Sequence, residues 1–340
     1  MKFDVMIAPK TLRAVPGLAQ QAEALGANGL WTSETQHHPF LPLPLVAEHT
    51  QRIQFGTAVA IAFGRSPLSL AHIAWDLAEQ SGGRFVLGLG TQVKPHVERR
   101  FGMPWPDSAM GKLREMIAAI RAIWRTWQTG ARLNFRGEHY KLTLMSPFFN
   151  PGPIDHPNVP IYIAGVNTAL AQLAGEVADG FHVHAYHTRR YLREVLIPAV
   201  AAGAARASRA RADVQLTSAV FVAIGEDDAA RRAMREDAHR QISFYASTPT
   251  YRSVMALHGL DDVAEQLSRL AVRGRWDEMP MLVPDAFVSE CVTEGTWDDI
   301  GARLRERYDG LLDRLAIYVP LSEAADLERW RRLAEAVRDN

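Results

Sequence analysis

Cysteine is almost absent from this chain of 340 residues, because Cys291 is the only one. A single cysteine excludes an intrachain disulfide, and it also excludes a metal site built from several thiolates. The neighbours of Cys291 include no group that activates a thiol, so we expect a structural cysteine. Disulfide and thiolate chemistry are therefore not expected here.

An excess of charge of one sign is also missing, since 38 lysines and arginines balance 38 aspartates and glutamates. A balanced chain has no overall field that attracts nucleic acid or an anionic membrane. No apolar run approaches the length that spans a bilayer, and residues 1–9 lack the apolar stretch of a signal peptide. We expect a cytoplasmic protein without nucleic-acid or membrane partners.

The chain contains many short apolar runs, and these alternate with helical patterns. Eight runs are expected as strands, because they are rich in Val, Ile, Leu and Phe, as in strands covered on both faces. They are Phe3–Ala8, Gly29–Ser33, Ile53–Ala62, Phe85–Gly90, Pro160–Ala164, Gly180–His184, Val214–Ile224 and Leu315–Val319. This order predicts the α/β class and a parallel sheet closed into a (β/α)8 TIM barrel.

Two insertions interrupt the barrel pattern. Residues 92–158 follow strand 4, and residues 226–312, expected to hold several helices, lie between strands 7 and 8. Each insertion leaves from the carboxyl end of a strand, which is the functional face of such barrels. Residues 1–320 are expected to form a single domain, and residues 321–340 a C-terminal helix packed on the barrel.

The segment from Pro160 to His184 is the most informative part of the chain. It predicts a buried strand, a tight turn, a short helix and a second strand. The residues of the turn are Ala164, Gly165, Val166, Asn167 and Thr168. They present backbone N–H groups at a helix N-terminus, which is a favourable place for an anion. These residues alone are compatible with a phosphate-bearing cofactor and equally with a strand–helix junction that binds nothing.

Acidic and imidazole side chains follow strand two: Glu34, His37 and His38. Catalytic residues of barrels lie at the carboxyl ends of strands, and these groups hold or accept protons near neutral pH. In the alternative interpretation, Glu34 pairs with a neighbouring arginine and the histidines line the rim of a pocket. The sequence supports the two interpretations equally.

Small residues mark the ends of strands three and four. Ala58, Val59 and Ala60 leave room for a flat ring against the backbone, although a small-residue layer of the barrel has the same composition. The glycines before Thr91 and Gln92 let another group approach the backbone, and these two residues add a hydroxyl and an amide. The glycine spacing is not that of a dinucleotide-binding unit.

Three histidines lie close together at strand six: His182, His184 and His187. Alternate strand positions place His182 and His184 on one face, as in metal-dependent barrel hydrolases. No matching set of ligands is evident on the other strands. We therefore expect no metal.

Taken together, these segments resemble the luciferase-like flavin and deazaflavin oxidoreductases, a family of (β/α)8 barrels. The resemblance runs from Phe3 to about Tyr318, and its carriers are Gly29–His37, Gly56–Val59 with Arg65–Pro67, Arg84–Gln92 and Ile163–Gly180. The run Lys94–Phe101, with Pro104–Pro106, is similar to a branch that uses the deazaflavin coenzyme F420.

The resemblance implies a cofactor site at the strand ends. Residues 164–168 would hold the cofactor phosphate. The pair Ala58–Val59, followed by Ala60, would match a bulge with a non-prolyl cis peptide bond that backs the ring. Thr91 and Gln92 would form hydrogen bonds with the ring or its side chain.

The resemblance also places His37 and His38 near the family's proton-donor region. In many relatives a histidine follows the acidic residue directly, whereas here Thr35 follows Glu34. The usual catalytic histidine has no counterpart, so the proton donor is one of Glu34, His37 and His38.

The leading prediction is an enzyme, an oxidoreductase that transfers a hydride between coenzyme F420 and a small organic substrate. A luciferase-like monooxygenase that uses FMN and molecular oxygen is the first alternative, because one fold serves both cofactors. A metal-dependent hydrolase and a cofactor-binding barrel without catalysis are the others. Dimers are common in the family, so the resemblance also implies a homodimer.

Overall fold

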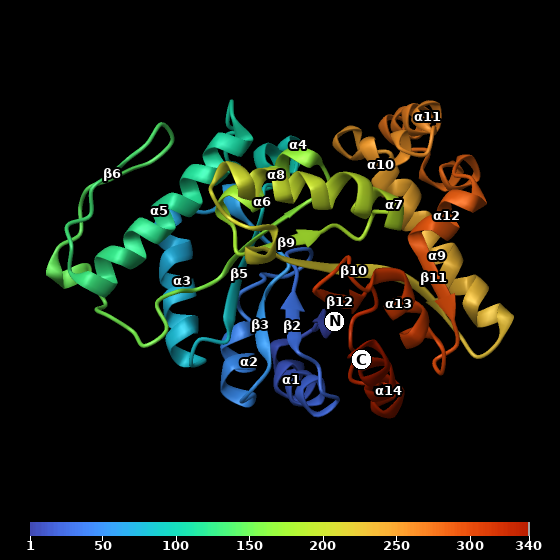
Figure 1. Ribbon diagram of the computed structural model, residues 1–340, viewed down its shortest axis with the longest axis horizontal. Helices are drawn as coiled ribbons and strands as arrows, with labels where there is room; N and C mark the ends of the chain where they lie inside the picture. Colours follow the sequence, from blue (N-terminus) through green and yellow to red (C-terminus); the bar gives the residue numbers. More distant parts are fainter. Residues whose placement is uncertain (339–340) are drawn as a thin grey trace.

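The computed structural model describes residues 1–338 and contains a closed barrel of parallel strands (Figure 1). In order around the barrel, the strands are β1 (Lys2–Ile7), β2 (Gly29–Thr32), β3 (Gln54–Thr57), β5 (Phe85–Gly90), β8 (Ile161–Gly165), β9 (Gly180–Val183), β10 (Gln215–Ile224) and β12 (Arg314–Ile317). The barrel closes because β12 pairs with both β10 and β1. The predicted TIM barrel is confirmed.

The barrel strands are buried on both faces, which explains their almost continuous apolar sequences. Every residue of β2, β5 and β12 is buried. The helices that accompany the strands are α1 (Val15–Ala24), α2 (Leu43–His49), α3 (Pro67–Gln80), α5 (Ala109–Thr129), α6 (Thr168–Val177), α7 (Arg189–Tyr191), α8 (Ile197–Arg206) and α13 (Ile300–Tyr308). Their apolar faces pack together as well: Trp75 of α3 stacks with Trp124 of α5 at 6.4 Å.

An ion pair closes the amino-terminal end of the barrel. Nε and Nη2 of Arg314 each donate to the Asp4 carboxylate at 2.8 Å, and both side chains are fully buried. The indole N–H of Trp31 donates to the same carboxylate at 2.8 Å, and Arg314 also donates to Gln54. These packed polar groups fill this end, so a ligand is expected at the carboxyl ends of the strands.

The first insertion carries α5, a second, shorter helix and a hairpin. It contains α4 (Lys94–Arg99) and the short strands β6 (Phe135–Arg136) and β7 (Lys141–Leu142). In Figure 1 the hairpin runs back alongside α5 from near the end of that helix. The carboxylate of Glu115, on α5, accepts hydrogen bonds from the backbone N–H groups of residues 138–140 and so fastens the hairpin.

The second insertion is mainly helical but contains a strand that the sequence did not predict. Its elements are α9 (Asp228–Ala246), α10 (Ser253–Ala256), α11 (Asp261–Val272), α12 (Asp285–Cys291) and β11 (Val292–Gly295). The expected helices are present, and the additional strand forms because β10 is long enough to pair with β11 beyond the barrel wall.

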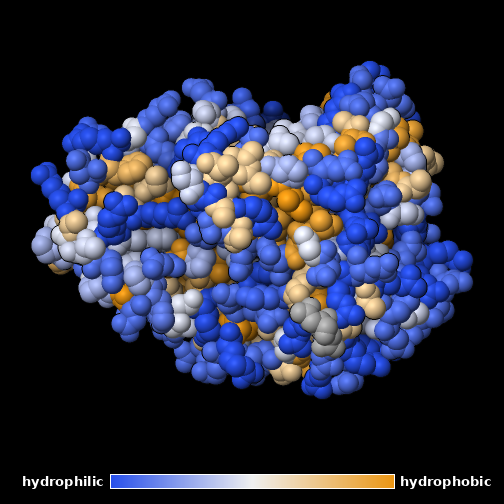
Figure 2. Space-filling view, viewed as in Figure 1, coloured by the Kyte–Doolittle hydropathy of each residue, from blue (hydrophilic) through white to orange (hydrophobic). Residues whose placement is uncertain are grey.

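The C-terminal helix, α14 (Leu327–Arg338), lies against the outside of the barrel, where Trp330 packs on Phe3 at 6.4 Å. It begins later than the predicted start at residue 321, and residues 339–340 of the prediction lie outside the described residues. Figure 2 shows a largely hydrophilic face with smaller apolar groups among the polar side chains. Within the described residues, no helix has both the length and the apolar character needed to cross a membrane.

Candidate active site

Three predicted cofactor segments meet at the carboxyl end of the barrel. The short strand β4 (Ala60–Ile61) pairs with the end of β5, and β5 pairs with β8. Consecutive strand ends therefore bring together residues 58–60, the pair Thr91 and Gln92, and residues 164–168. Their neighbouring positions are consistent with a single elongated ligand, although each segment was singled out separately in the sequence.

A bulge with a cis peptide bond separates β3 from β4. The bond lies between Ala58 and Val59, as the resemblance implies. The continuous strand predicted over residues 53–62 is therefore wrong in its middle. The Val59 side chain covers Gly90, where a Cβ atom would lie 2.6 Å from Val59 Cγ2. Ala58 and Val59 remain partly exposed, so the bulge presents a surface at the mouth of the barrel.

Thr57 fastens β3 to β5 just before the bulge. Its hydroxyl donates to the Gly88 carbonyl oxygen at 2.6 Å and accepts from the Gly88 N–H at 3.1 Å. A Cβ atom on residue 88 would lie 1.7 Å from the Thr57 carbonyl oxygen, so only glycine fits. The group that approaches Gly88 is thus the neighbouring strand rather than a ligand.

Thr91 and Gln92 follow β5 at the rim. Thr91 is buried, whereas Gln92 is partly exposed and has a left-handed backbone with φ of 59°. The side-chain oxygen of Gln92 accepts a hydrogen bond from the Val93 N–H at 3.0 Å. The side-chain oxygen of Gln92 is thus engaged by its own loop, whereas its two side-chain N–H donors remain available to a ligand.

The turn after β8 has the features of an anion site. Asn167 caps α6 by accepting from the Leu170 N–H at 3.0 Å, and the Val166 carbonyl accepts from the Tyr191 hydroxyl at 3.0 Å. Within the described part of the chain, no acceptor is found for the backbone N–H groups of residues 166–168. Thr168, the first residue of α6, is exposed. Free N–H donors and the positive end of the helix dipole therefore coincide here.

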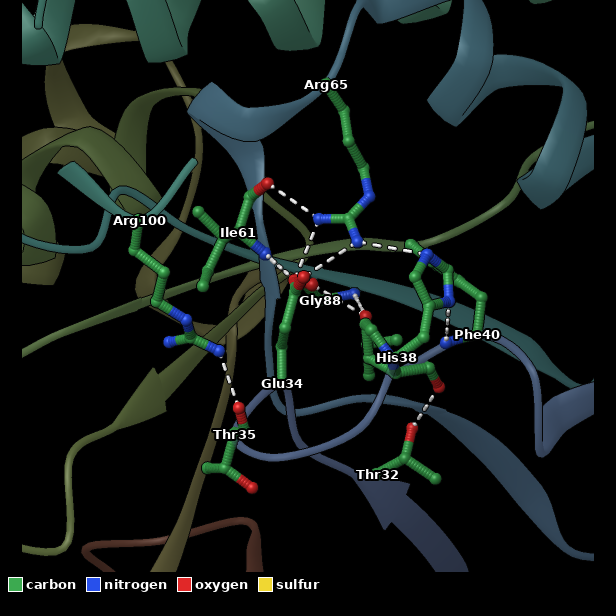
Figure 3. A network of polar contacts seen from close by, with 11 residues as sticks. Thr32, Glu34, Thr35, His38, Phe40, Ile61, Arg65, Gly88 and Arg100 are labelled. Carbon is green, nitrogen blue, oxygen red and sulfur yellow. Dashed lines mark hydrogen bonds and ion pairs between the residues drawn. The ribbon is translucent and has the colours of Figure 1, made fainter. Parts of the chain in front are cut away.

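Glu34 is held by donors from two groups (Figure 3). Arg65 donates to its two carboxylate oxygens at 2.7 and 2.8 Å, and the Ile61 N–H donates at 2.7 Å. The Arg65 and Glu34 side chains are only 12% and 7% exposed. The structure therefore contains the arginine pairing that was the second interpretation of Glu34. Because Ile61 belongs to β4, this carboxylate also anchors the strand that follows the bulge.

His38 borders the same network. Arg65 Nη2 lies 3.2 Å from its Nε2, and the Phe40 N–H donates to its Nδ1 at 3.3 Å. Both neighbours are donors; a neutral imidazole accepts from one of them through its single unprotonated nitrogen, whereas a protonated imidazole has no acceptor. Burial and the charge of Arg65 lower the pKa of His38, although Glu34 acts in the opposite direction. At neutral pH, His38 is therefore a neutral ring that is better placed to accept a proton than to donate one.

This arrangement predicts opposite effects of two substitutions on His38. Arg65→Gln should raise its pKa, because the substitution removes a positive charge beside the ring. Glu34→Gln should lower it further, because the substitution removes the charge that favours the imidazolium. NMR titration of the histidine Cε1–H signals measures both effects. A pKa that moves in the same direction in both variants would contradict this electrostatic account.

His37 lies on the exposed part of the loop after β2, together with Thr35. Arg100 donates to the Thr35 carbonyl oxygen at 2.5 Å, which fastens the loop to the first insertion. The three candidates after strand two therefore differ in environment: Glu34 is in a largely buried ion pair, whereas His37 and His38 are both exposed and only His38 contacts that pair.

The histidines of strand six lie in different environments. His182 is inside the barrel, with its ring 5.0 Å from that of Trp31 and 5.2 Å from that of Tyr162, and burial lowers its pKa to about 3. The buried His187 donates through Nδ1 to the His184 carbonyl oxygen at 2.8 Å. Among residues 1–338, no group of three or more His, Cys, Asp or Glu side chains is arranged to hold a metal ion.

The family model described as luciferase-like monooxygenase matches residues 1–314. The chain belongs to the luciferase-like monooxygenase family. This membership makes the protein an enzyme of an oxidoreductase family and agrees with the barrel and the cis peptide bond described above.

Relatives of this luciferase-like protein include F420-dependent enzymes. It is 43% identical to an uncharacterized protein of Mycobacterium tuberculosis over 98% of both chains. It is 29% identical to the F420-dependent glucose-6-phosphate dehydrogenase of Amycolatopsis mediterranei, over 89% of this chain and 87% of that one. The structure of the F420-dependent tetrahydromethanopterin reductase of Methanopyrus kandleri shares the fold, with a TM-score of 0.78 and 19% identity over 99% and 98% of the two chains.

Several groups at the mouth of this luciferase-like barrel were missed by sequence reasoning. Arg65 was noted only as part of a motif, and Thr57 only as part of a small-residue strand. Tyr245 and Tyr318 were not singled out at all, although their hydroxyl oxygens are 2.8 Å apart. Tyr318 directly follows the last barrel strand, and that position is a signal from which a role could have been predicted.

Proposed function

We propose that the protein is an F420-dependent oxidoreductase that transfers a hydride between the deazaflavin ring and a small organic substrate. The observation that carries the proposal is the turn at residues 166–168, whose N–H donors are free, beside a bulge that presents a partly exposed surface. Together they suit a ligand that has a phosphate at one point and a flat ring at another. The 29% identity to an F420-dependent dehydrogenase supports this choice of cofactor.

The residues of the mouth fit such a group. The amides of residues 166–168 would hold the phosphate, and the bulge at Ala58–Val59 would lie behind the ring. Gln92 would add side-chain N–H donors near the ring. The hydride chemistry would come from the cofactor when bound, whereas the protein supplies position and electrostatics.

The proposed role of Glu34 is to position the ring-backing bulge. Its carboxylate accepts hydrogen bonds from Arg65 and from the N–H of Ile61, on the strand that continues from the bulge. In this proposal Glu34 is not the proton donor, because its oxygens are already engaged by donors. His38, as a neutral ring, would accept a proton rather than donate one.

A monooxygenase that uses FMN and molecular oxygen is the second candidate, because the family description names monooxygenases. FMN also carries a phosphate and a flat ring, so the same turn and bulge would suit it. The two candidates differ in their cofactor and in their need for oxygen.

Fluorescence titration of the purified protein with F420 and, separately, with FMN tests the proposal. We expect the dissociation constant for F420 to be at least about tenfold lower than that for FMN, a difference of about 1.4 kcal/mol. Tighter binding of FMN would favour the monooxygenase, and oxygen consumption with reduced FMN would then be the next measurement. Failure to bind either cofactor would overturn both candidates.

A further inference from the structure

His184 lies at the mouth of the barrel, on the same side of its strand as an interior histidine. Its N–H continues the β8–β9 ladder by donating to the Gly165 carbonyl oxygen at 3.1 Å. Side chains two positions apart on an extended chain point the same way, so His184 lies above the interior His182. His182 is buried, whereas His184 is partly exposed. The His184 ring thus borders the space in which a ligand would lie.

Hydrogen bonding fixes which nitrogen of His184 carries the proton. The Tyr186 N–H donates to Nδ1 at 3.1 Å, so Nδ1 is an acceptor. In a neutral imidazole the proton is then on Nε2, which becomes a donor. Within residues 1–338 no partner is found for this Nε2, and it is not among the fully buried unpaired atoms, which include Nε2 of His182 and His187. His184 therefore presents an unpartnered N–H donor that is not completely buried.

Two tyrosine rings hold the imidazole of His184 in place. The Tyr245 ring lies edge-on at 4.6 Å, and the Tyr251 ring lies at 5.1 Å. The Tyr245 hydroxyl is in turn 2.8 Å from that of Tyr318, at the end of the last barrel strand. The second insertion, which carries Tyr245 and Tyr251, therefore fixes the orientation of a side chain at the mouth.

We propose that His184 binds the substrate, with its Nε2–H donating a hydrogen bond to a carbonyl or hydroxyl oxygen of an uncharged organic molecule. The inference rests on the proposed function and names its substrate class. A donor of fixed direction would orient the carbon that bears the oxygen over the ring and stabilise negative charge that develops on that oxygen.

The surroundings of His184 favour an uncharged substrate. Burial, with a smaller effect of His187, lowers the pKa of His184 to about 4, so the ring is neutral at neutral pH. The tyrosine rings that contact it are also uncharged, since burial raises the pKa values of both Tyr245 and Tyr251. A carboxylate or phosphate bound beside His184 would meet hydrogen-bond donors and aromatic rings. None of His184, Tyr245 and Tyr251 would supply a positive charge to balance it.

Histidine-selective ¹⁵N NMR of the wild-type protein tests the donor directly. We expect His184 to show the tautomer with the proton on Nε2, and cyclohexanone to shift this signal. Methylenecyclohexane, which has the same shape without the oxygen, should not shift it. The signal of His156, which precedes the barrel strand β8, serves as the internal control. A proton on Nδ1, or no response to cyclohexanone, would overturn the inference.

Two substitutions add a binding measurement. His184→Phe removes the donor, whereas His184→Gln keeps an N–H near the Nε2 position. We expect the dissociation constant for cyclohexanone to rise about threefold to tenfold in His184→Phe and to recover in part in His184→Gln. Equal affinity for cyclohexanone in all three proteins would contradict the assignment.

The cofactor titration separates failure of this inference from failure of the proposed function. If the protein binds no F420 but cyclohexanone shifts the His184 signal, the cofactor assignment fails and the donor assignment stands. If F420 binds and the His184 signal does not respond, only the donor assignment fails. The NMR result on the wild-type protein does not depend on whether the variants fold.

Discussion

Replacing Arg314 with methionine should lower the free energy of unfolding by about 3–5 kcal/mol, because the change leaves a buried charge without its partner. Arg314 and Asp4 are fully buried, and two hydrogen bonds of 2.8 Å join them. In Arg314→Met the Asp4 carboxylate would keep only the N–H of Trp31. Equilibrium unfolding in urea, followed by tryptophan fluorescence and circular dichroism, measures the loss.

The exposed pair Arg331–Glu328 provides the control, since its side chains are 46% and 63% exposed. Arg331→Met should cost less than about 1 kcal/mol, because exposed ion pairs contribute little. The double variant Asp4→Leu with Arg314→Met should recover part of the loss, because it leaves no unpaired charge. If the double variant is less stable than Arg314→Met alone, unpaired charge is not the cause of the destabilisation.

The barrel was predictable from the sequence because its strands lie in short segments rich in apolar residues that alternate with helical patterns. The additional strand at Val292–Gly295 was missed because it contains Thr, Glu and Gly and pairs with a single neighbour, β10. The apolar pattern did not predict the break after Thr57, because all residues across it are small or apolar, and only the resemblance implied the bulge at Ala58–Val59. Local sequence patterns indicate where apolar segments lie. They do not show where the pairing between strands breaks or continues beyond the barrel.

The sequence predicted the positions of the candidate site on separate strand ends. It did not predict the contacts between these positions. Glu34 and Arg65 are both visible in the sequence, yet only the fold brings the carboxylate to both the guanidinium and the Ile61 N–H. His184 was noticed as a metal ligand candidate. The Tyr186 N–H makes Nε2 the donor, and the Tyr245 ring of the second insertion fixes its direction. Sequence spacing predicts neither contact.

Thr168→Glu should weaken cofactor binding about tenfold to a hundredfold while leaving the fold intact. Thr168 is the exposed first residue of α6, where a carboxylate stabilises the helix by about 0.3–1 kcal/mol. The same carboxylate would repel a phosphate bound at the amides of residues 166–168. Gly165 is a poorer site for this test, because a Cβ atom there would lie 2.6 Å from Leu170 and distort the turn itself.

Thr168→Gln is the matched control, since glutamine has the size of glutamate without its charge. We expect its affinity for the cofactor to stay within about threefold of the wild type, and the effect of glutamate to shrink as salt screens the repulsion. Thermal unfolding should show Thr168→Glu to be at least as stable as Thr168→Gln. Because a phosphate bound at these amides would be repelled by the new carboxylate, equal cofactor affinities of the two variants at low salt would place the phosphate elsewhere.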